Sequence, residues 1–273
     1  MAKLLSVILP LFFSIIFHSF AESKDLSLTV VYDNNPYRKG LETRWGFSCF
    51  IEGTERSILF DVGGEGPVLL KNMAMLKIDP SDVDVIVLSH IHYDHIGGLS
   101  SFLEKNSKVT VYMPNSFPLS IKDVVKNACT KLIKVKGPLK ISTNVFSTGE
   151  LGTWIKEETL IIKTNLGLII ITGCAHPGVV NIVKKAKGMF SSPIRVYMVL
   201  GGFHLCWMNR FQIRGIVNGI KKEGVKRVAP CHCSGDLARK IFKKEYKNDF
   251  ILAGAGKRID LIDAFPPTTI NKN

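Results

Sequence analysis

A short segment that follows an apolar run gathers four potential metal ligands. Residues 83–88 have the composition of a buried strand, and His90, His92, Asp94 and His95 come directly after it. A loop at the end of a buried strand can direct its side chains into a cleft. Imidazole and carboxylate together suit Zn²⁺, Mn²⁺ or Fe, whereas a calcium site would use oxygen ligands alone. The segment therefore predicts a metal site, with zinc as the first choice of metal.

The spacing of these four residues favours two ions. Alternate side chains of an extended segment share one side, so His90, His92 and Asp94 point the same way, and a turn begun near Asp94 brings His95 round. His90 with His92 would then hold one ion and Asp94 with His95 a second, about 3.5–4 Å apart as in two-metal hydrolysis. A lone histidine is usually a core residue whose ring nitrogens have hydrogen-bond partners. Four potential ligands within six residues are better explained by metal binding.

This His-x-His-x-Asp-His pattern resembles the metallo-β-lactamase fold superfamily. The resemblance extends to residues 58–64, ILFDVGG, which look like the first motif of that superfamily, and it covers most of the chain from about residue 26. It implies an α/β (α+β) fold in which two sheets lie between helices, the αββα sandwich, with the metal cleft along one edge of the sheets. Asp61, within the first motif, stands where a buried acid could orient the histidine loop.

The three remaining histidines after residue 21 each follow an apolar run. They are His176, His204 and His232, after residues 167–172, 196–200 and 228–230. Any one of them could be a structural core histidine, but all three follow apolar runs, which is unusual for surface histidines. His176 is the best third ligand of the first ion, because no histidine lies between His95 and His176. His232 resembles the last ligand of the superfamily and would complete the second site.

Two roles stay open at this point. His204 is assigned to the substrate oxyanion or leaving group, although it could displace His176 as a ligand. The segment 173–176, GCAH, stands where the superfamily has a Gly-Asp whose carboxylate bridges the ions. The ions would then be linked by hydroxide alone or also by the Cys174 thiolate.

Three motifs are similar to one branch of the superfamily. They are GCAHPG at 173–178, GGFHL at 201–205 and PCHCSG at 230–235. The branch comprises metal-dependent hydrolases related to dihydropterin–ribofuranosylaminobenzene phosphate synthase of methanopterin biosynthesis. That synthase joins a pterin diphosphate to a ribosyl phosphate in the cytosol, so an exported relative is expected to keep the fold and the site with a different reaction.

The N-terminus has the pattern of a signal peptide. Lys3 precedes an apolar core at 4–17, and Ser19 and Ala21 place small residues before a cleavage site. Fourteen residues of helix span only about 21 Å, short of the roughly 30 Å hydrocarbon layer. We therefore expect a signal peptide at 1–21, one metallo-β-lactamase-like domain at 22–273, export to the periplasm or the medium, and no stable membrane anchor after cleavage.

The chain is strongly basic. It carries 36 Lys and Arg against 23 Asp and Glu, and because Lys3 is the only charged residue of 1–21, the mature chain keeps a net charge of +12. The excess lies in residues 131–140, 184–187, 221–227 and 239–247. Such clusters attract anionic substrates, anionic lipids or nucleic acid, or they are simply solvated helix faces.

Six cysteines permit disulfides in an exported protein, but their spacing is not that of a small stapled scaffold. Cys174, Cys231 and Cys233 stand beside histidines and are more interesting as site residues. Cysteines two apart on a strand would form a strained bridge, so Cys231 and Cys233 are not expected to pair. Buried, inert thiols are the default for Cys49 and Cys129.

Strand and helix patterns alternate along the mature chain, which indicates one layered α/β domain. The strands are expected at 26–33, 45–52, 57–61, 82–88, 109–113, 143–146, 159–164, 167–172, 194–200, 226–228 and 250–252. The helices are expected at 68–76, 96–104, 119–129, 178–187, 210–222 and 234–242, and the basic segment after residue 129 has no clear pattern.

These observations predict an exported binuclear hydrolase in which a metal-bound hydroxide attacks a small anionic ester that carries a phosphate. Asp94 would be both a ligand and the acceptor of the water proton. The alternatives are a nuclease or phosphodiesterase of the superfamily, a synthase-like transferase, and a metal- or pterin-binding module without turnover. The signal peptide and the lack of an added nucleic-acid domain count against nucleic acid as the substrate.

Overall fold

Seven strands form the first of two sheets, in the order β13-β1-β2-β3-β4-β5-β6. The computed structural model describes residues 25–128 and 130–265, so the signal peptide expected at 1–21 lies outside the described residues. The strands are β1 (Leu26–Asp33), β2 (Phe47–Glu52), β3 (Ile58–Phe60), β4 (Val85–Val87), β5 (Thr110–Pro114), β6 (Lys131–Val135) and β13 (Arg258–Leu261). The helices along this half are α1 (Gly66–Met75), α2 (Tyr93–Ile96), α3 (Leu99–Lys105) and α4 (Leu119–Asn127).

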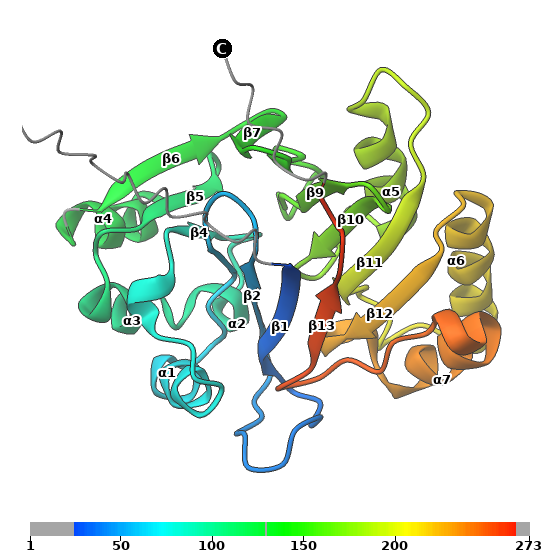
Figure 1. Ribbon diagram of the computed structural model, residues 1–273, viewed down its shortest axis with the longest axis horizontal. Helices are drawn as coiled ribbons and strands as arrows, with labels where there is room; N and C mark the ends of the chain where they lie inside the picture. The colour runs from blue at the N-terminus through cyan, green and yellow to red at the C-terminus, as the bar shows by residue number, and fades with distance from the viewer. Residues whose placement is uncertain (1–24, 129, 266–273) are drawn as a thin grey trace, which may run out of the picture.

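Six strands form the second sheet, in the order β12-β11-β10-β9-β8-β7. They are β7 (Leu139–Ser142), β8 (Val145–Ser147), β9 (Leu160–Thr164), β10 (Gly167–Thr172), β11 (Val196–Gly202) and β12 (Arg227–Cys231). The helices of this half are α5 (Val179–Gly188), α6 (Arg210–Lys222) and α7 (Asp236–Tyr246). Figure 1 shows α1, α3 and α4 on one side, α5, α6 and α7 on the other, and the two sheets between them. The predicted αββα sandwich is confirmed.

The central strands of both sheets are buried on both faces. In β10, Ile169 and Ile171 pack into the core between the sheets, whereas Leu168 and Ile170 pack against the outer helices. Because successive side chains of a strand point to opposite faces, a strand in the middle of such a sandwich needs apolar residues at every position. This explains why the strand signals in the sequence are continuous apolar runs.

The carboxyl ends of parallel strands carry the predicted site residues. β3, β4 and β5 run parallel in the first sheet, and Asp61 and His90 follow two of them. β10, β11 and β12 run parallel in the second sheet, and their ends are followed by Cys174, His204 and His232. Loops at the carboxyl ends of parallel strands meet at one edge of a sheet, which is a common place for binding sites.

Three expectations about elements need correction. Residues 250–252 do not form a strand; only Phe250 makes an isolated bridge, with Val228. The final strand is instead β13, which pairs antiparallel with β1 and was not predicted. The basic segment after residue 129 contains β6 and β7, the edge strands of the two sheets, so its lysines are not on a helix face.

The helix expected at 96–104 is divided into α2 and α3 by Gly97 and Gly98. A Cβ at Gly97 would lie 2.1 Å from the Gly64 carbonyl oxygen, and one at Gly98 would lie 2.2 Å from that of Val62. The two glycines therefore let the histidine loop pack directly on the turn after β3. Among residues 25–128 and 130–265, we find no helix with the length and hydropathy that a membrane span requires.

Asn72 ties the loop before β2 to the first half of the fold. Its buried side chain donates to the carbonyl oxygens of Val31 (3.0 Å) and Glu42 (2.8 Å) and accepts from the Glu42 N–H (2.9 Å). The loop it holds, residues 34–46, also carries Asn34, which contacts the site described below.

We predict that Asn72→Ala lowers the free energy of unfolding by about 2–4 kcal/mol, because it leaves one buried and two partly buried backbone groups without this partner. Urea denaturation followed by far-UV circular dichroism measures this. Asn127→Ala, at the exposed end of α4, should change the value by less than about 0.5 kcal/mol. Equal effects of the two substitutions would contradict the role of Asn72.

Candidate metal centre

The residues predicted for the first ion lie together. The Nε2 atom of His90 is 3.1 Å from the Nδ1 atom of His92. The His176 ring is 4.6 Å from the His90 ring and 4.8 Å from the His92 ring, between centroids. His90, Cys174 and His176 form one group of potential ligands whose ligand atoms lie within 4.8 Å of one another.

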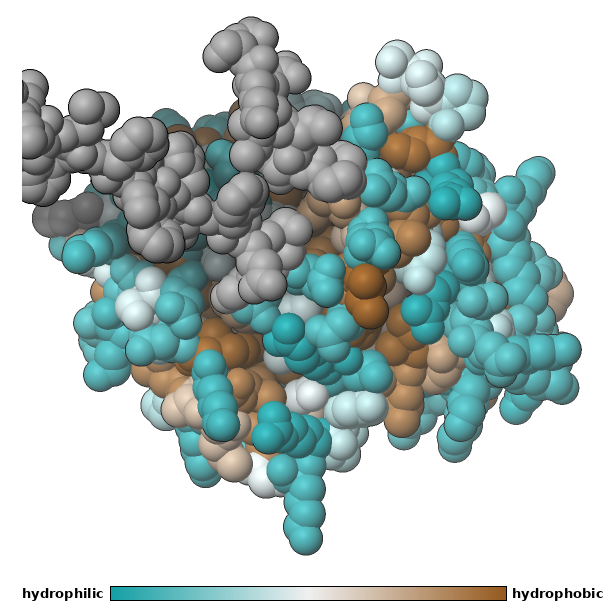
Figure 2. Space-filling model, in the orientation of Figure 1, coloured by the Kyte–Doolittle hydropathy of each residue, from teal (hydrophilic) through white to brown (hydrophobic). Residues whose placement is uncertain are grey.

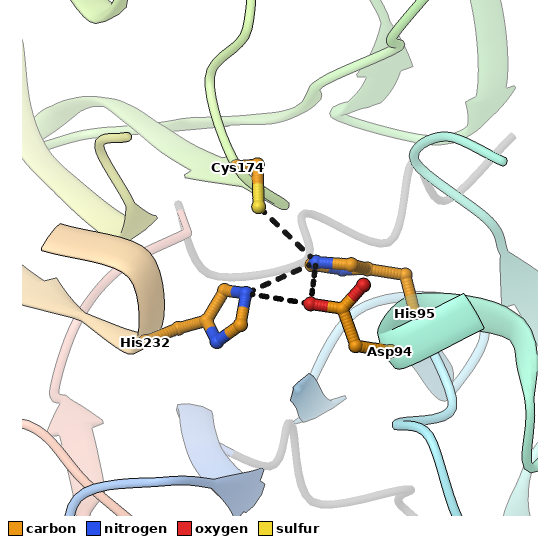
Figure 3. A group of neighbouring side chains, drawn as sticks. All are labelled: Asp94, His95, Cys174 and His232. Carbon is orange, nitrogen blue, oxygen red and sulfur yellow. Dashed lines mark hydrogen bonds and ion pairs between the residues drawn. The ribbon is translucent and has the colours of Figure 1, made fainter. Parts of the chain in front are cut away.

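The residues predicted for the second ion form an adjacent group (Figure 3). The His232 Nε2 atom is 3.2 Å from Asp94 Oδ2 and 3.2 Å from His95 Nε2. Asp94 and His95 come from α2, and His232 comes from the single 3₁₀ turn (His232–Ser234) after β12. The fold thus brings together three residues from positions 94 to 232, as the sequence predicts.

Cys174 belongs to both groups. Its Sγ atom is 3.3 Å from His95 Nε2, and it is also grouped with His90 and His176. The thiol therefore lies where a ligand shared by two ions would have to lie. In the superfamily pattern, the carboxylate of a Gly-Asp pair is expected at this point of the sequence, and here Cys174 takes its place.

His204 lies at the edge of this cluster. Its ring is 4.5 Å from the His176 ring, and its side chain is exposed and hydrogen-bonded to the Cys233 thiol. His204 forms a third group with Cys174 and Cys233, so Cys174 belongs to all three groups. Cys231 is buried as a free thiol and is in none of these groups.

Four of the imidazoles are fixed through Nδ1, which leaves Nε2 for the centre of the site. The contacts are His90 to Ser89 Oγ (2.9 Å), His95 to Asp61 Oδ2 (2.7 Å), His176 to Glu157 Oε2 (2.9 Å) and His232 to Asn34 Oδ1 (2.9 Å). Metal-binding histidines commonly make such a second hydrogen bond, which fixes the tautomer and the ring orientation. The expectation that Asp61 orients the histidine loop is confirmed.

Glu157 is a site residue that the sequence did not reveal. Its buried carboxylate accepts from the backbone N–H groups of Cys174 (3.0 Å), Ala175 (2.8 Å) and His176 (2.9 Å), in addition to the His176 ring. Burial would raise the pKa of this carboxyl, but the His176 bond and the other donors hold the pKa at about 2. Glu157 and Glu158 precede an ordinary apolar strand. Nothing in their spacing therefore indicated that Glu157 belongs to the site.

Burial favours the neutral form of His90 and His95. Burial lowers the pKa of His95 to about 3 and holds the pKa of His90 well below its ordinary value. Burial also opposes ionisation of Asp94, but the hydrogen bond from His232 lowers the pKa of this carboxyl. Neutral imidazole and ionised carboxylate are the forms that bind metal.

The Nε2 atom of His176 is buried and has no hydrogen-bond partner. A buried nitrogen without a partner costs free energy. The Nε2 atoms of His95 and His232 also face each other at 3.2 Å, while their Nδ1 atoms are hydrogen-bonded to Asp61 and Asn34. A divalent cation would satisfy these atoms, so the donor set of three or more nitrogens, a carboxylate and a thiol fits Zn²⁺ or a similar ion.

The backbone is strained where it presents these groups. Asp61, Ala175, His204 and His232 have positive φ angles of 57°, 60°, 54° and 45°. Non-glycine residues rarely adopt this conformation, and it concentrates at functional sites where the surrounding structure enforces it. Exposed aromatic side chains lie beside the same segments: Trp45 stands 4.9 Å from the His232 ring, and Tyr93 and Trp207 are 70% and 87% exposed.

Comparison with known proteins identifies the family. The model of the metallo-beta-lactamase superfamily matches residues 46–190, more than half of the chain. The 7,8-dihydropterin-6-methyl-4-(beta-D-ribofuranosyl)-aminobenzene-5'-phosphate synthase of Methanocaldococcus jannaschii is 30% identical, over 85% of this chain and 95% of the synthase. The chain therefore belongs to the metallo-β-lactamase superfamily, and its resemblance to the synthase branch is confirmed.

Solved structures agree with this placement. Tm1679, described as a metal-dependent hydrolase of the beta-lactamase superfamily, is 29% identical with a TM-score of 0.73, over 86% of this chain and 99% of that one. The short form of human tRNase Z is 16% identical with a TM-score of 0.57, over 85% of this chain and 98% of that one. The second likeness concerns the fold alone.

We predict that Glu157→Gln weakens metal binding by about 10–100-fold, because an amide cannot accept from three backbone donors and the His176 ring as a carboxylate does. Equilibrium dialysis against graded chelator concentrations measures the affinity. Glu245→Gln, at an exposed ion pair with Lys221, should leave it unchanged. Unaltered affinity in Glu157→Gln would show that His176 does not depend on this carboxylate.

Proposed function

We propose that this member of the metallo-β-lactamase superfamily is an exported hydrolase that uses two divalent metal ions, zinc in the first instance, to cleave a small anionic ester carrying a phosphate. The observation that supports it most directly is the pair of adjacent ligand groups that share Cys174. A single ion would leave the nitrogen atoms of one group unsatisfied. Both groups together fit a two-metal site.

The ligand sets follow from the contacts. His90, His92 and His176 would hold the first ion, and Asp94, His95 and His232 the second, with Cys174 between them. Ions bound there would supply Lewis acidity and bring the pKa of a bound water toward about 7. Glu157 and Asp61 hold the imidazole rings in place throughout the reaction.

Asp94 and His204 would carry the proton transfers. The Asp94 side chain is 20% exposed, so one edge faces the solvent of the cleft while Oδ2 contacts His232. Its lowered pKa keeps it ionised, which is the form in which it would bind a metal ion and accept the proton of an attacking water. His204 is exposed at the rim, and its hydrogen bond to Cys233 raises its pKa, so it can carry a proton to the leaving group.

The charge of the protein supports an anionic substrate. Exposed lysines lie on α6 and α7, among them Lys221, Lys222, Lys240, Lys243 and Lys244. In Figure 2, hydrophilic residues dominate the side of the molecule that these helices occupy in Figure 1. Positive charge around a site that holds cations would raise the rate at which anions reach it.

The proposal of export depends on residues 1–21 alone, which have the sequence pattern of a signal peptide. N-terminal sequencing of the protein recovered from its native cells tests it. A chain that begins at Glu22 supports export, and a chain that retains Lys3 contradicts it.

A transferase is the second candidate, since the Methanocaldococcus relative at 30% identity is a synthase with a phosphate-bearing product. A hydrolase needs only water, whereas a transferase needs a second substrate as acceptor. We therefore propose to screen the metal-loaded mature chain against phosphomonoesters, phosphodiesters, lactones, thioesters and β-lactams. Product release without an acceptor supports hydrolysis, and turnover only with an acceptor supports the transferase.

The other two alternatives have distinct outcomes in the same screen. Cleavage of RNA well above that of small phosphodiesters would support a nuclease. A metal-binding or pterin-binding module without turnover would show ligand binding, no product, and no effect of Asp94→Asn on that binding.

We predict two tightly bound ions per mature chain, because each ligand group offers at least three donor atoms. Elemental analysis after removal of excess metal measures the ratio. His90→Ala and His232→Ala should each reduce it to about one, whereas Asp123→Ala, an exposed acid on α4, should not change it. One ion or fewer in the wild type under excess metal contradicts a binuclear site.

We predict that kcat/KM falls at least about threefold between ~20 mM and ~300 mM salt while kcat stays nearly constant, because screening weakens capture of the anion and not the chemical step. Steady-state kinetics on the best ester from the screen provide the measurement. An insensitive kcat/KM, or much faster turnover of neutral lactones, would mean that the lysine clusters are only solvated surface.

A further inference from the structure

Two thiols face each other beside the metal-ligand groups. The Sγ atoms of Cys174 and Cys233 are 3.2 Å apart, and the two residues are 3% and 2% exposed. Cys174 follows β10 and Cys233 follows β12, so their contact joins the ends of two strands with β11 between them. The proposed reaction uses Cys233 only as the hydrogen-bond partner of His204.

Gly202 provides the space in which these sulfur atoms meet. A Cβ built at Gly202 would lie 2.6 Å from Cys233 Sγ and 3.2 Å from the Cα of Cys174. Any side chain at the end of β11 would therefore displace one of the two cysteines. The thiol contact is therefore possible because β11 ends in a glycine, which has no side chain.

The backbone holds both cysteines in this contact. The Cys233 carbonyl oxygen accepts from the N–H groups of Leu205 and Cys206, each at 3.1 Å, and the Cys174 N–H donates to Glu157 at 3.0 Å. A disulfide requires the sulfur atoms to be about 2.05 Å apart, so they need to approach by only about 1 Å. Rotation of the two side chains is a smaller change than a movement of either loop.

The pair lies beside two side chains that reach the surface. Cys233 is hydrogen-bonded to the exposed His204, and Cys174 contacts His95 beside the partly exposed Asp94. Cys49 and Cys231, by contrast, are 0% exposed and belong to the core between the sheets. Cys206 is more exposed than either member of the pair, so what distinguishes Cys174 and Cys233 is the contact between their two sulfur atoms and not their accessibility.

We propose that Cys174 and Cys233 are a redox pair that hydrogen peroxide converts to a disulfide, and that this bond withdraws Cys174 from both metal-ligand groups. One sulfur attacks the peroxide, breaks its O–O bond and becomes S–OH as one water leaves. The second thiol displaces that hydroxyl as a second water and forms the S–S bond. The two sulfurs together lose two electrons and two protons, and the peroxide is reduced to two molecules of water.

The consequence for metal follows from the geometry, and this part alone rests on the proposed function. Cys174 Sγ cannot be both a disulfide sulfur and a thiolate ligand. Bound metal should therefore protect the pair from oxidation, and oxidation should release metal.

The experiment treats the mature chain, metal-loaded and chelator-stripped, with dilute peroxide, blocks free thiols and maps tryptic peptides by mass. Trypsin places Cys174 in 164–184 and both Cys231 and Cys233 in 228–239. We expect a cross-link between these peptides with a mass about 2 Da below their sum, reversed by dithiothreitol. We expect it to form at least about tenfold more slowly in the metal-loaded protein.

Two variants identify the sulfur involved. Cys231→Ser should keep the cross-link, and Cys233→Ser should abolish it, with Cys174 then found as higher oxidation products. Absence of the cross-link in the stripped wild type, or its loss in Cys231→Ser alone, overturns the proposal. So does a reduced Cys233→Ser protein that binds one ion fewer than the wild type, because Cys233 would then be a ligand. A cross-link that forms at the same rate with and without metal keeps the redox pair and contradicts only the role of Cys174 as a metal ligand.

Discussion

The site depends on hydrogen bonds at the Nδ1 atoms of four imidazoles, those of His90, His95, His176 and His232. Ser89, Asp61, Glu157 and Asn34 supply these bonds, and each comes from a different place in the chain. With Nδ1 engaged, only Nε2 remains for the centre, and the rings cannot turn without leaving a buried acceptor unpaired. The ligand geometry is therefore set by residues that do not themselves face the ligand.

Those anchors are in turn held by the sandwich. Asp61 follows β3 and accepts from the Ser89 N–H and hydroxyl after β4, so one carboxylate fixes the ends of two parallel strands. The Glu157 carboxylate accepts from backbone N–H groups of the turn after β10. The Asp33 carboxylate accepts from the His232 N–H after β12. Both halves of the fold thus meet at one edge, and Cys174 lies at the point where their ligand groups overlap.

This arrangement has a cost in folding stability. It buries imidazole nitrogen atoms that face one another and leaves His176 Nε2 without a partner. It also holds four non-glycine residues at positive φ angles: Asp61, Ala175, His204 and His232. Each such feature costs of the order of 1–3 kcal/mol. The compensation comes from the apolar core between the two sheets and, when present, from bound cations.

The sequence alone determined the apolar strands, the alternation of strands and helices, the family, and the positions from His90 to His95 where ligands gather. These signals are local: a strand buried on both faces must be apolar at every position, and ligands that share one loop must lie close together in the chain. The tertiary structure decided that His176 and His232 join different groups, that Cys174 lies between them, and that Glu157 and Asn34 orient two of the rings. It also decided that β13 pairs with β1 and that Cys233 meets Cys174 across Gly202. These contacts join residues 19 to more than 200 positions apart, and no local periodicity encodes them, because they depend on which strand ends the sandwich brings to one edge.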